Sequence, residues 1–163
     1  MIIADTDFLS AFLKIGRLGL VFKALETKEI VIAGAVFHEV EQAPVYSKLL
    51  DALQSKDQKI IVKKVTVSDS EDFGRGEIES ISLAEKFNGL LLMNDRKAAK
   101  YAESREITVM DIPIFLLHCR TNNYLSNKDL NQIIKDLKEK DYYEFSAEVK
   151  ERLLKFKRNL LFR

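Results

Sequence analysis

The sequence predicts an α/β protein in which a central parallel sheet carries helices on both faces and is followed by a pair of C-terminal helices. Short apolar runs alternate with helical patterns up to about residue 125, as expected of strands joined by crossover helices. From Ser126 onward, two amphipathic helical segments follow each other with no strand between them. Of the 163 residues, 47% are hydrophobic and 31% are charged, which is ordinary for a globular domain with its own core. We therefore expect an α/β domain over 1–125 and a helical extension over 126–163.

Hydrophobic periodicity assigns the elements before residue 67. Apolar residues at i, i+3, i+4 and i+7 spacing predict a helix at 16–27, and β-branched residues predict a strand at 59–65. Pro44 suits the first turn of a helix. In chain order we expect a strand at 2–4, helices at 7–15 and 16–27, a strand at 30–33, helices at 35–42 and 44–56, and a strand at 59–65.

The remaining elements follow a polar, glycine-containing loop at 67–76. Gly89 is expected to end the next helix, because glycine is the usual residue at a helix C-terminus. Ser126 and Asp129 form a capping-box pair, and Ser146 is placed to cap the last helix. In chain order we expect a helix at 77–88, a strand at 90–93, a helix at 95–105, a strand at 107–110, and helices at 111–122, 126–141 and 145–161.

Four acidic residues each stand where an apolar run gives way to a helical segment: Asp5, Glu39, Glu77 and Asp95. Residues just past the carboxyl ends of parallel strands converge on one edge of the sheet, where such folds place their sites. Four carboxylates gathered there would repel one another unless they held a cation. An oxygen-rich site of this kind suits Mg²⁺ or Mn²⁺. Asp7 lies two residues beyond Asp5 and could reach the same ion.

Metal-dependent phosphodiester hydrolysis is the chemistry that this set of acids would support. Carboxylates hold one or two divalent ions, which lower the pKa of a bound water and polarise the phosphate. No nucleophilic side chain is needed, and the chain has only two histidines. Arg96, Lys97 and Lys100 follow Asp95 on one predicted helix. They either bind substrate phosphate or are simply exposed.

The acids also have structural alternatives when each is taken alone. Helix caps and first-turn positions would account for Asp5, Asp7, Glu77, Asp95 and, most simply, Asp111. Glu39 differs because it stands inside an apolar stretch, where a buried carboxylate without a partner would be costly. The hypothesis of a metal site therefore rests on the set rather than on one member.

These residues and their surroundings resemble a PIN domain, the fold of many prokaryotic VapC-type toxin ribonucleases. The segment IIADTDFLSAF is similar to the family's opening strand, aspartate, threonine and helix. In EIESISLAEKFNGLLLMND, Glu77, Ala84 and Asp95 fill the places of an acid that opens a helix, an alanine seven residues on, and a final aspartate. The form GEIESISLA also resembles a PIN subgroup with a GEAEAI-like motif, and the terminal helix pair is similar to that subgroup's C-terminal extension.

The resemblance implies a Rossmann-like, three-layer PIN fold and a Mg²⁺- or Mn²⁺-dependent endoribonuclease acting on RNA. Its acidic cluster would consist of Asp5, Glu39, Glu77 and Asp95. Asp7 stands where Ser or Asn is common and would add a metal contact. Met93 departs from the pattern, because many members have Thr or Ser two residues before the last aspartate. The family also implies a possible toxin role with a protein antitoxin, and a homodimer.

Two other functions stay open from the sequence. A PIN-like body could serve as a binding or scaffold module without turnover, since acids persist in inactive relatives. A metal-dependent phosphatase of small molecules would share the acids but not their spacing.

The composition of the chain also bears on its cellular location and on its binding partners. No apolar run approaches the ~20 residues of a membrane span, and the start MIIADTDF does not resemble a signal peptide. The single cysteine, Cys119, fits a reducing cytoplasm and is expected to be a structural thiol. Residues 148–163 hold six basic and two acidic residues. This tail could attract a polyanion such as RNA or could be a solvated helix face.

Overall fold

The computed structural model describes residues 1–68 and 70–155, and these residues form the predicted parallel sheet. Its strands lie in the order β3-β2-β1-β4-β5, and all neighbouring strands are parallel. They are β1 (Ile2–Ala4), β2 (Glu29–Ala33), β3 (Lys59–Lys63), β4 (Leu90–Leu92) and β5 (Val109–Met110). The chain order runs outward on both sides of β1. The carboxyl end of β1 is therefore the switch point where α/β folds open a crevice.

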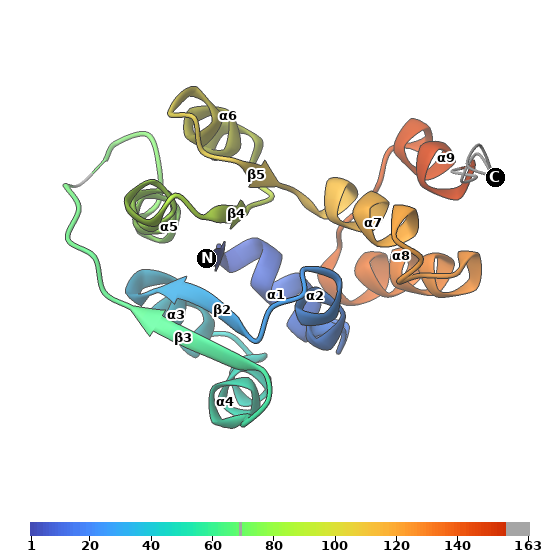
Figure 1. Cartoon of the computed structure of the whole chain (residues 1–163), viewed down its shortest axis with the longest axis horizontal. Coiled ribbons are helices and arrows are strands. Elements are labelled where there is room, and N and C mark those ends of the chain that lie inside the picture. The colour runs from blue at the N-terminus through green and yellow to red at the C-terminus, as the bar shows by residue number, and fades with distance from the viewer. Residues whose placement is uncertain (69, 156–163) are drawn as a thin grey trace.

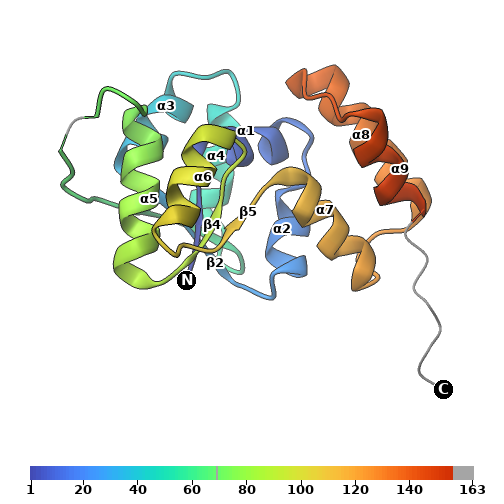
Figure 2. The same cartoon turned by 90° about the horizontal axis from the view of Figure 1, so that it is seen from above.

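Helices cover both faces of this sheet, which confirms the predicted three-layer α/β architecture. They are α1 (Thr6–Lys14), α2 (Leu18–Ala24), α3 (Gly34–Glu41), α4 (Tyr46–Gln54), α5 (Arg75–Phe87), α6 (Arg96–Ser104), α7 (Ile112–Thr121), α8 (Asn127–Asp141) and α9 (Ala147–Lys155). In Figure 1, α5 lies on one side of the strands and α1, α2 and α7 on the other, and α3 contacts both α5 and α1. The pair α8 and α9 packs outside α1 and α7, as the view from above also shows (Figure 2).

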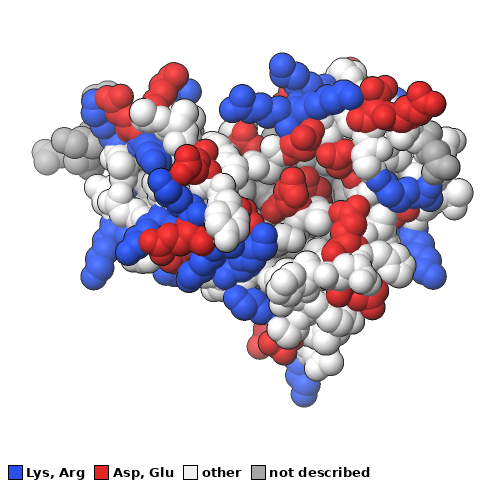
Figure 3. Space-filling view, turned by 180° about the vertical axis from the view of Figure 1, so that it is seen from behind, with Lys and Arg blue, Asp and Glu red and all other residues white. Residues whose placement is uncertain are grey.

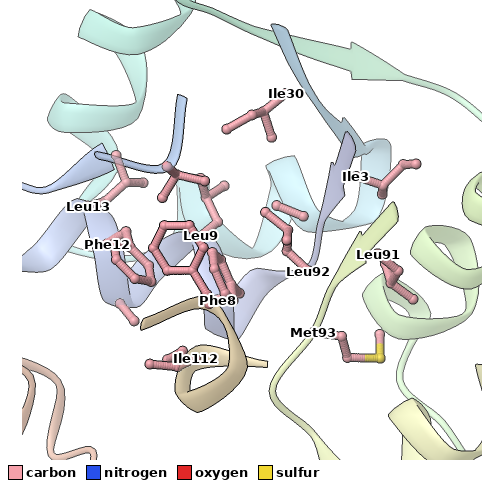
Figure 4. Close-up of a cluster of buried hydrophobic side chains, with 14 of the residues drawn as sticks. Ile3, Phe8, Leu9, Phe12, Leu13, Ile30, Leu91, Leu92, Met93 and Ile112 are labelled. Atoms are coloured by element: carbon pink, nitrogen blue, oxygen red, sulfur yellow. The ribbon is translucent and has the colours of Figure 1, made fainter. Parts of the chain in front are cut away.

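Aromatic side chains hold α1 and α7 together in the core (Figure 4). Phe8 and Phe12 lie one turn apart on α1, with ring centroids 4.9 Å apart. Both meet Phe115 of α7 edge to face, at 5.7 and 5.1 Å. All three rings are at most 1% exposed, and burying each contributes roughly 1.5–3 kcal/mol. This packing holds α1 rigidly behind the residues that follow β1.

Two sequence-based details of α5, its first residue and its C-terminal cap, are corrected by the structure. The helix begins at Arg75 rather than at residue 77, with Gly74 as its N-cap. It ends at Phe87, and its C-cap Asn88 adopts the left-handed conformation with φ of 48°, so Gly89 is not the left-handed residue. Gly89 is required for a different reason: a Cβ there would lie 3.0 Å from the Met1 carbonyl oxygen and closer still to the Ile3 side chain. A side chain would therefore push β4 away from β1.

The C-terminal helices form as predicted within the described residues. Ser126 and Asp129 make the predicted capping box, with the Asp129 N–H donating to Ser126 Oγ at 3.1 Å. Ser146 Oγ accepts from the Val149 N–H at 3.2 Å, which confirms the second cap. The predicted end of the last helix, and the basic residues beyond Lys155, lie outside the described residues.

Two further expectations concern chemistry and membranes. Cys119 is fully buried, and burial raises the pKa of its thiol to about 12, as expected of a structural cysteine. In the part of the chain that the structure describes, no helix has the length and apolar character needed to cross a bilayer.

Candidate active site

Asp5 is the first residue after β1, and it is the buried acid of the set. Its backbone N–H donates to the Leu92 carbonyl of β4 at 3.0 Å, and its Oδ1 accepts the Phe8 N–H at 2.8 Å as the N-cap of α1. Only 3% of the residue is exposed. The pKa of Asp5 is raised from 3.8 to about 8, mainly because burial disfavours the charged carboxylate. The negative charges of Asp7 and Glu77 contribute to this rise, and backbone hydrogen bonds from Phe8 and Asn94 oppose it.

Glu39 lies on α3 and reaches across to α1 and α5. The expectation that it is buried was wrong, because the residue is exposed. The apolar stretch around it belongs to a helix whose other face, with Val36 and Val40, packs into the core. The Thr6 hydroxyl donates to Glu39 Oε2. A Cβ on Gly76 would lie only 2.7 Å from Glu39 Oε1, so the absence of a side chain at Gly76 makes room for this carboxylate.

Glu77 and Asp95 both face the same region from helix N-termini. Glu77 lies in the first turn of α5, where one carboxylate oxygen accepts the Gly74 N–H at 2.8 Å. Asp95 is the N-cap of α6 and accepts the Ala98 N–H at 2.8 Å. The capping alternatives from the sequence are therefore correct for both residues. Capping uses one oxygen of each carboxylate and also holds the side chain in place.

An acidic pocket of about 300 Å³ at the carboxyl end of β1 brings Asp5, Glu39 and Glu77 together, whereas Asp95 is not part of its lining. Its lining consists of Asp5, Thr6, Asp7, Glu39, Gly74 and Glu77. The pKa of Glu77 is raised by desolvation and then by the charges of Asp95, Asp7 and Glu39. Asp95 is thus within electrostatic reach of the pocket. Figure 3 shows acidic side chains gathered in the hollowed middle of one face, with Lys and Arg around it.

Glu79 is a buried acid of α5 that was not among the predicted site residues. It is 7% exposed, and it points away from the acidic pocket. Its Oε2 accepts the Ala35 N–H at 2.9 Å and its Oε1 accepts from Arg75 Nε at 2.8 Å. Ala33 precedes α3 and has no capping side chain, so Glu79 caps this helix from α5. It thereby positions the helix that carries Glu39.

Removing this carboxylate should destabilise the fold. We expect Glu79→Ala to lower the free energy of unfolding by about 1–3 kcal/mol, because the start of α3 loses its cap and the ion pair between Glu79 and Arg75 is lost. Thermal unfolding would measure the change. Glu85→Ala is the matched control: Glu85 lies on the same helix and pairs with Arg105 at 2.6 Å, but both are exposed, where an ion pair contributes little. Equal losses in the two variants would contradict the capping role.

Comparison with known proteins decides the family. The family model DUF3368, described as a PIN domain, matches residues 1–158. The chain belongs to the PIN domain family. Among solved structures, a PilT N-terminus domain protein, SSO1118, from the hyperthermophilic archaeon Sulfolobus solfataricus P2 is similar, with a TM-score of 0.53 and 17% identity over 71% of this chain and 90% of that one. At this identity the likeness bears on the fold. No curated protein matches the chain.

The acidic pocket of this PIN domain has the donors that a hard divalent cation prefers. PIN domains are typically metal-dependent nucleases, and carboxylate oxygens suit Mg²⁺ and Mn²⁺. Desolvation is the main cause that raises the pKa values of Asp5, Asp7 and Glu77, and mutual repulsion adds to it. A cation would relieve this repulsion. Within residues 1–68 and 70–155, no three His, Cys, Asp or Glu side chains already lie in an arrangement that could hold a metal ion. The carboxylates would therefore have to draw together around one.

The end of α8 lies near the acidic pocket. Asp141, at the end of α8, pairs with Lys14 of α1 at 2.7 Å, and its charge helps to raise the pKa of Asp7, after desolvation as the main cause. Burial raises the pKa of Tyr143, while a hydrogen bond from the Asn94 side chain lowers it. Nothing local in the sequence marks Asp141, because the contact joins residues 127 positions apart.

The basic residues expected to bind substrate have different surroundings. Arg96 and Lys100 are exposed on α6. Lys97 pairs with Asp72 at 3.0 Å and lies 5.1 Å from the centre of the Phe73 ring. Met93 is fully buried in the core of the PIN domain, so the position offers no hydroxyl to the site.

Proposed function

We propose that this chain is a divalent-metal-dependent endoribonuclease that hydrolyses phosphodiester bonds of RNA in the acidic pocket. The observation that carries the proposal is the gathering of Asp5, Asp7, Glu39 and Glu77 in one pocket at the carboxyl end of β1, within electrostatic reach of Asp95. Membership of the PIN family supports a nuclease of this kind. A carboxylate set without a nucleophilic serine or cysteine suits hydrolysis by water.

The side chains of the site would have different roles in the reaction, according to their burial and position. Asp5, Glu39, Glu77 and Asp95 would hold Mg²⁺ or Mn²⁺, with Asp7 as a further contact. A bound divalent ion would lower the pKa of a water and neutralise charge on the phosphate. Thr6 orients Glu39 through their hydrogen bond.

RNA cleavage by the purified chain tests the proposal. We expect single-stranded RNA to be cut internally with Mn²⁺ or Mg²⁺, and not with EDTA. Undiminished cleavage in EDTA would contradict the metal-dependent mechanism. Calorimetric titration with Mn²⁺ distinguishes the nuclease from a scaffold module, because a scaffold module is expected to show no saturable binding of Mn²⁺. Hydrolysis of a generic phosphomonoester without any cleavage of RNA would favour a phosphatase instead.

The finer biological role is also a proposal. A PIN nuclease of this size could act in the cytoplasm as the toxin of a toxin–antitoxin pair, as a homodimer restrained by a protein antitoxin. Arg96, Lys97 and Lys100 would steer the RNA from the α6 side. Size-exclusion chromatography with light scattering tests the dimer, and a monomer at micromolar concentration would contradict it.

A further inference from the structure

A second and larger concavity lies on the other side of the contact between α3 and α5. This basic groove has a volume of about 810 Å³, and its lining includes Gly34, His38, Lys64, Arg75, Glu79 and Lys86. The lining residues come from the start of α3, the segment after β3, and one face of α5. Three separate parts of the chain therefore form the groove, and no single sequence motif predicts it.

The charges of the basic groove favour an anionic ligand. Arg75 and Glu79 form an ion pair at 2.8 Å and together contribute no net charge. Lys64 and Lys86 are exposed, and neither forms an ion pair with any residue that the structure describes. Lys86 lies 5.6 Å from the centre of the Phe87 ring, a contact that leaves its charge available. Among the described residues, the groove thus presents to solvent two positive charges that no ion pair neutralises.

The basic groove adjoins the acidic pocket along two helices. Gly74 lines the acidic pocket and Arg75 the groove. On α3, Glu39 lines the pocket and His38 the groove. The close approach of Gly76 to the Glu39 carboxylate forms the partition between them. An extended polymer cleaved in the pocket could therefore continue directly into the groove.

We infer that the basic groove binds the phosphate backbone of the RNA strand next to the bond that is cleaved, with Lys64 and Lys86 as the phosphate contacts. The inference rests on the proposed function and extends it by a substrate-binding surface. The acidic pocket repels a polyanion, so the affinity for RNA has to come from positive charge nearby. On α6, the alternative side, the Lys97 ammonium is already paired with Asp72, and the exposed Arg96 and Lys100 line neither the groove nor the acidic pocket. Lys64 and Lys86 line a groove that adjoins the pocket.

The salt dependence of RNA binding tests this inference without any cleavage. The wild-type chain and Lys64→Gln/Lys86→Gln would be titrated with a fluorescent single-stranded RNA in EDTA at several KCl concentrations. Each phosphate contact contributes about −0.7 to the slope of log K against log salt for single strands. We expect the variant to lose about 1.4 from the slope. At 0.1 M KCl this corresponds to roughly 25-fold weaker binding if the affinities converge near 1 M.

Two matched pairs control for net charge and for the rival path. Lys23→Gln/Lys28→Gln removes the same charge from exposed lysines in the last turn of α2 and before β2, and should leave the slope unchanged. Arg96→Gln/Lys100→Gln removes it from α6. In metal-activated cleavage, the groove variant should lower kcat/KM and leave kcat at saturating RNA unchanged.

The outcomes separate this inference from the proposed function. An unchanged slope in the groove variant would overturn the inference, and so would an equal loss of slope in the Lys23/Lys28 pair. In either case, RNA cleavage by the wild-type chain would still support the proposed function. A slope lost only in the α6 pair would also overturn it. Groove-dependent RNA binding by a wild-type chain that cuts no RNA with Mn²⁺ would support the groove and contradict the nuclease.

Discussion

Asp5→Asn is expected to abolish metal-dependent RNA cleavage, with a loss of at least about 100-fold. Asp5 is the buried acid of the pocket, and Asn would supply a neutral oxygen in place of a carboxylate where a cation has to be held. Asn is also a good N-cap, so it can still accept the Phe8 N–H. The change therefore removes charge without removing the start of α1. Cleavage of a labelled RNA with Mn²⁺ measures the effect.

The same substitution should stabilise the metal-free protein, increasingly as pH rises. Burial raises the pKa of Asp5 from 3.8 to about 8. Between these values the folded chain keeps a proton that the unfolded chain has lost, so the free energy of unfolding falls as pH rises, by at most about 1.4 kcal/mol per unit. Asp5→Asn removes this penalty. In EDTA, its Tm relative to wild type should climb from pH 5 to pH 8.

Asp111→Asn is the matched control for both effects. Asp111 also follows a strand and caps a helix, with its Oδ1 accepting the Ile114 N–H at 2.8 Å and backbone angles close to those of Asp5. It does not line the acidic pocket. We expect its cleavage rate to remain that of wild type. RNA cleavage by Asp5→Asn at the wild-type rate would contradict the proposed mechanism.

Gly76→Ala should disable the site without harming the fold. The new Cβ would lie 2.7 Å from Glu39 Oε1 and 3.0 Å from Oε2, so the Glu39 carboxylate has to swing away. Alanine is favoured over glycine within a helix by up to ~1 kcal/mol, and the displaced atoms are the end of a flexible side chain. We expect an unchanged or higher Tm together with a loss of cleavage of about 10- to 100-fold, the usual scale for disturbed metal-site geometry.

Gly19→Ala separates helix propensity from site geometry. Gly19 is the second residue of α2, as Gly76 is of α5, and its added Cβ would meet Gln58 Oε1 at an ordinary 3.7 Å. Its Tm should change in the same direction with no change in cleavage. Full activity in Gly76→Ala would mean that the observed place of Glu39 does not matter for the reaction.

Most of the fold could be predicted from local patterns, because each signal lay within a few residues. The parallel strands, the Asp111 cap and the Ser126 capping box all formed as expected. Apolar periodicity and caps report on a single element, and α/β alternation leaves few topologies to choose from. The C-terminal cap of α5 was predicted wrongly, because Gly89 is required by tertiary packing and not by the helix end. Without a Cβ at this position, the chain can lie close to Met1 and Ile3.

In the candidate site, too, some features could be predicted from local sequence and others could not. The order of the acids along the chain predicted that they would meet, since parallel strands bring their carboxyl ends to one edge. Local sequence could not say which acid is buried: Glu39 lies on the outward face of α3, whereas Asp5 is enclosed between β1, β4 and α1. Nor could it reveal that Glu79 caps α3, or that Lys64 and Lys86 share a groove.

By itself, the sequence determined the strands, the helices and the set of acids at the sheet edge, because these depend on spacing along one chain. Only the tertiary structure decided which carboxyl group is desolvated, where Glu39 finds room beside Gly76, and where positive charge gathers next to the acidic pocket. These properties arise where separate elements meet. Burial, close approach and electrostatic repulsion depend on distances in space, which the spacing of residues along the chain does not set.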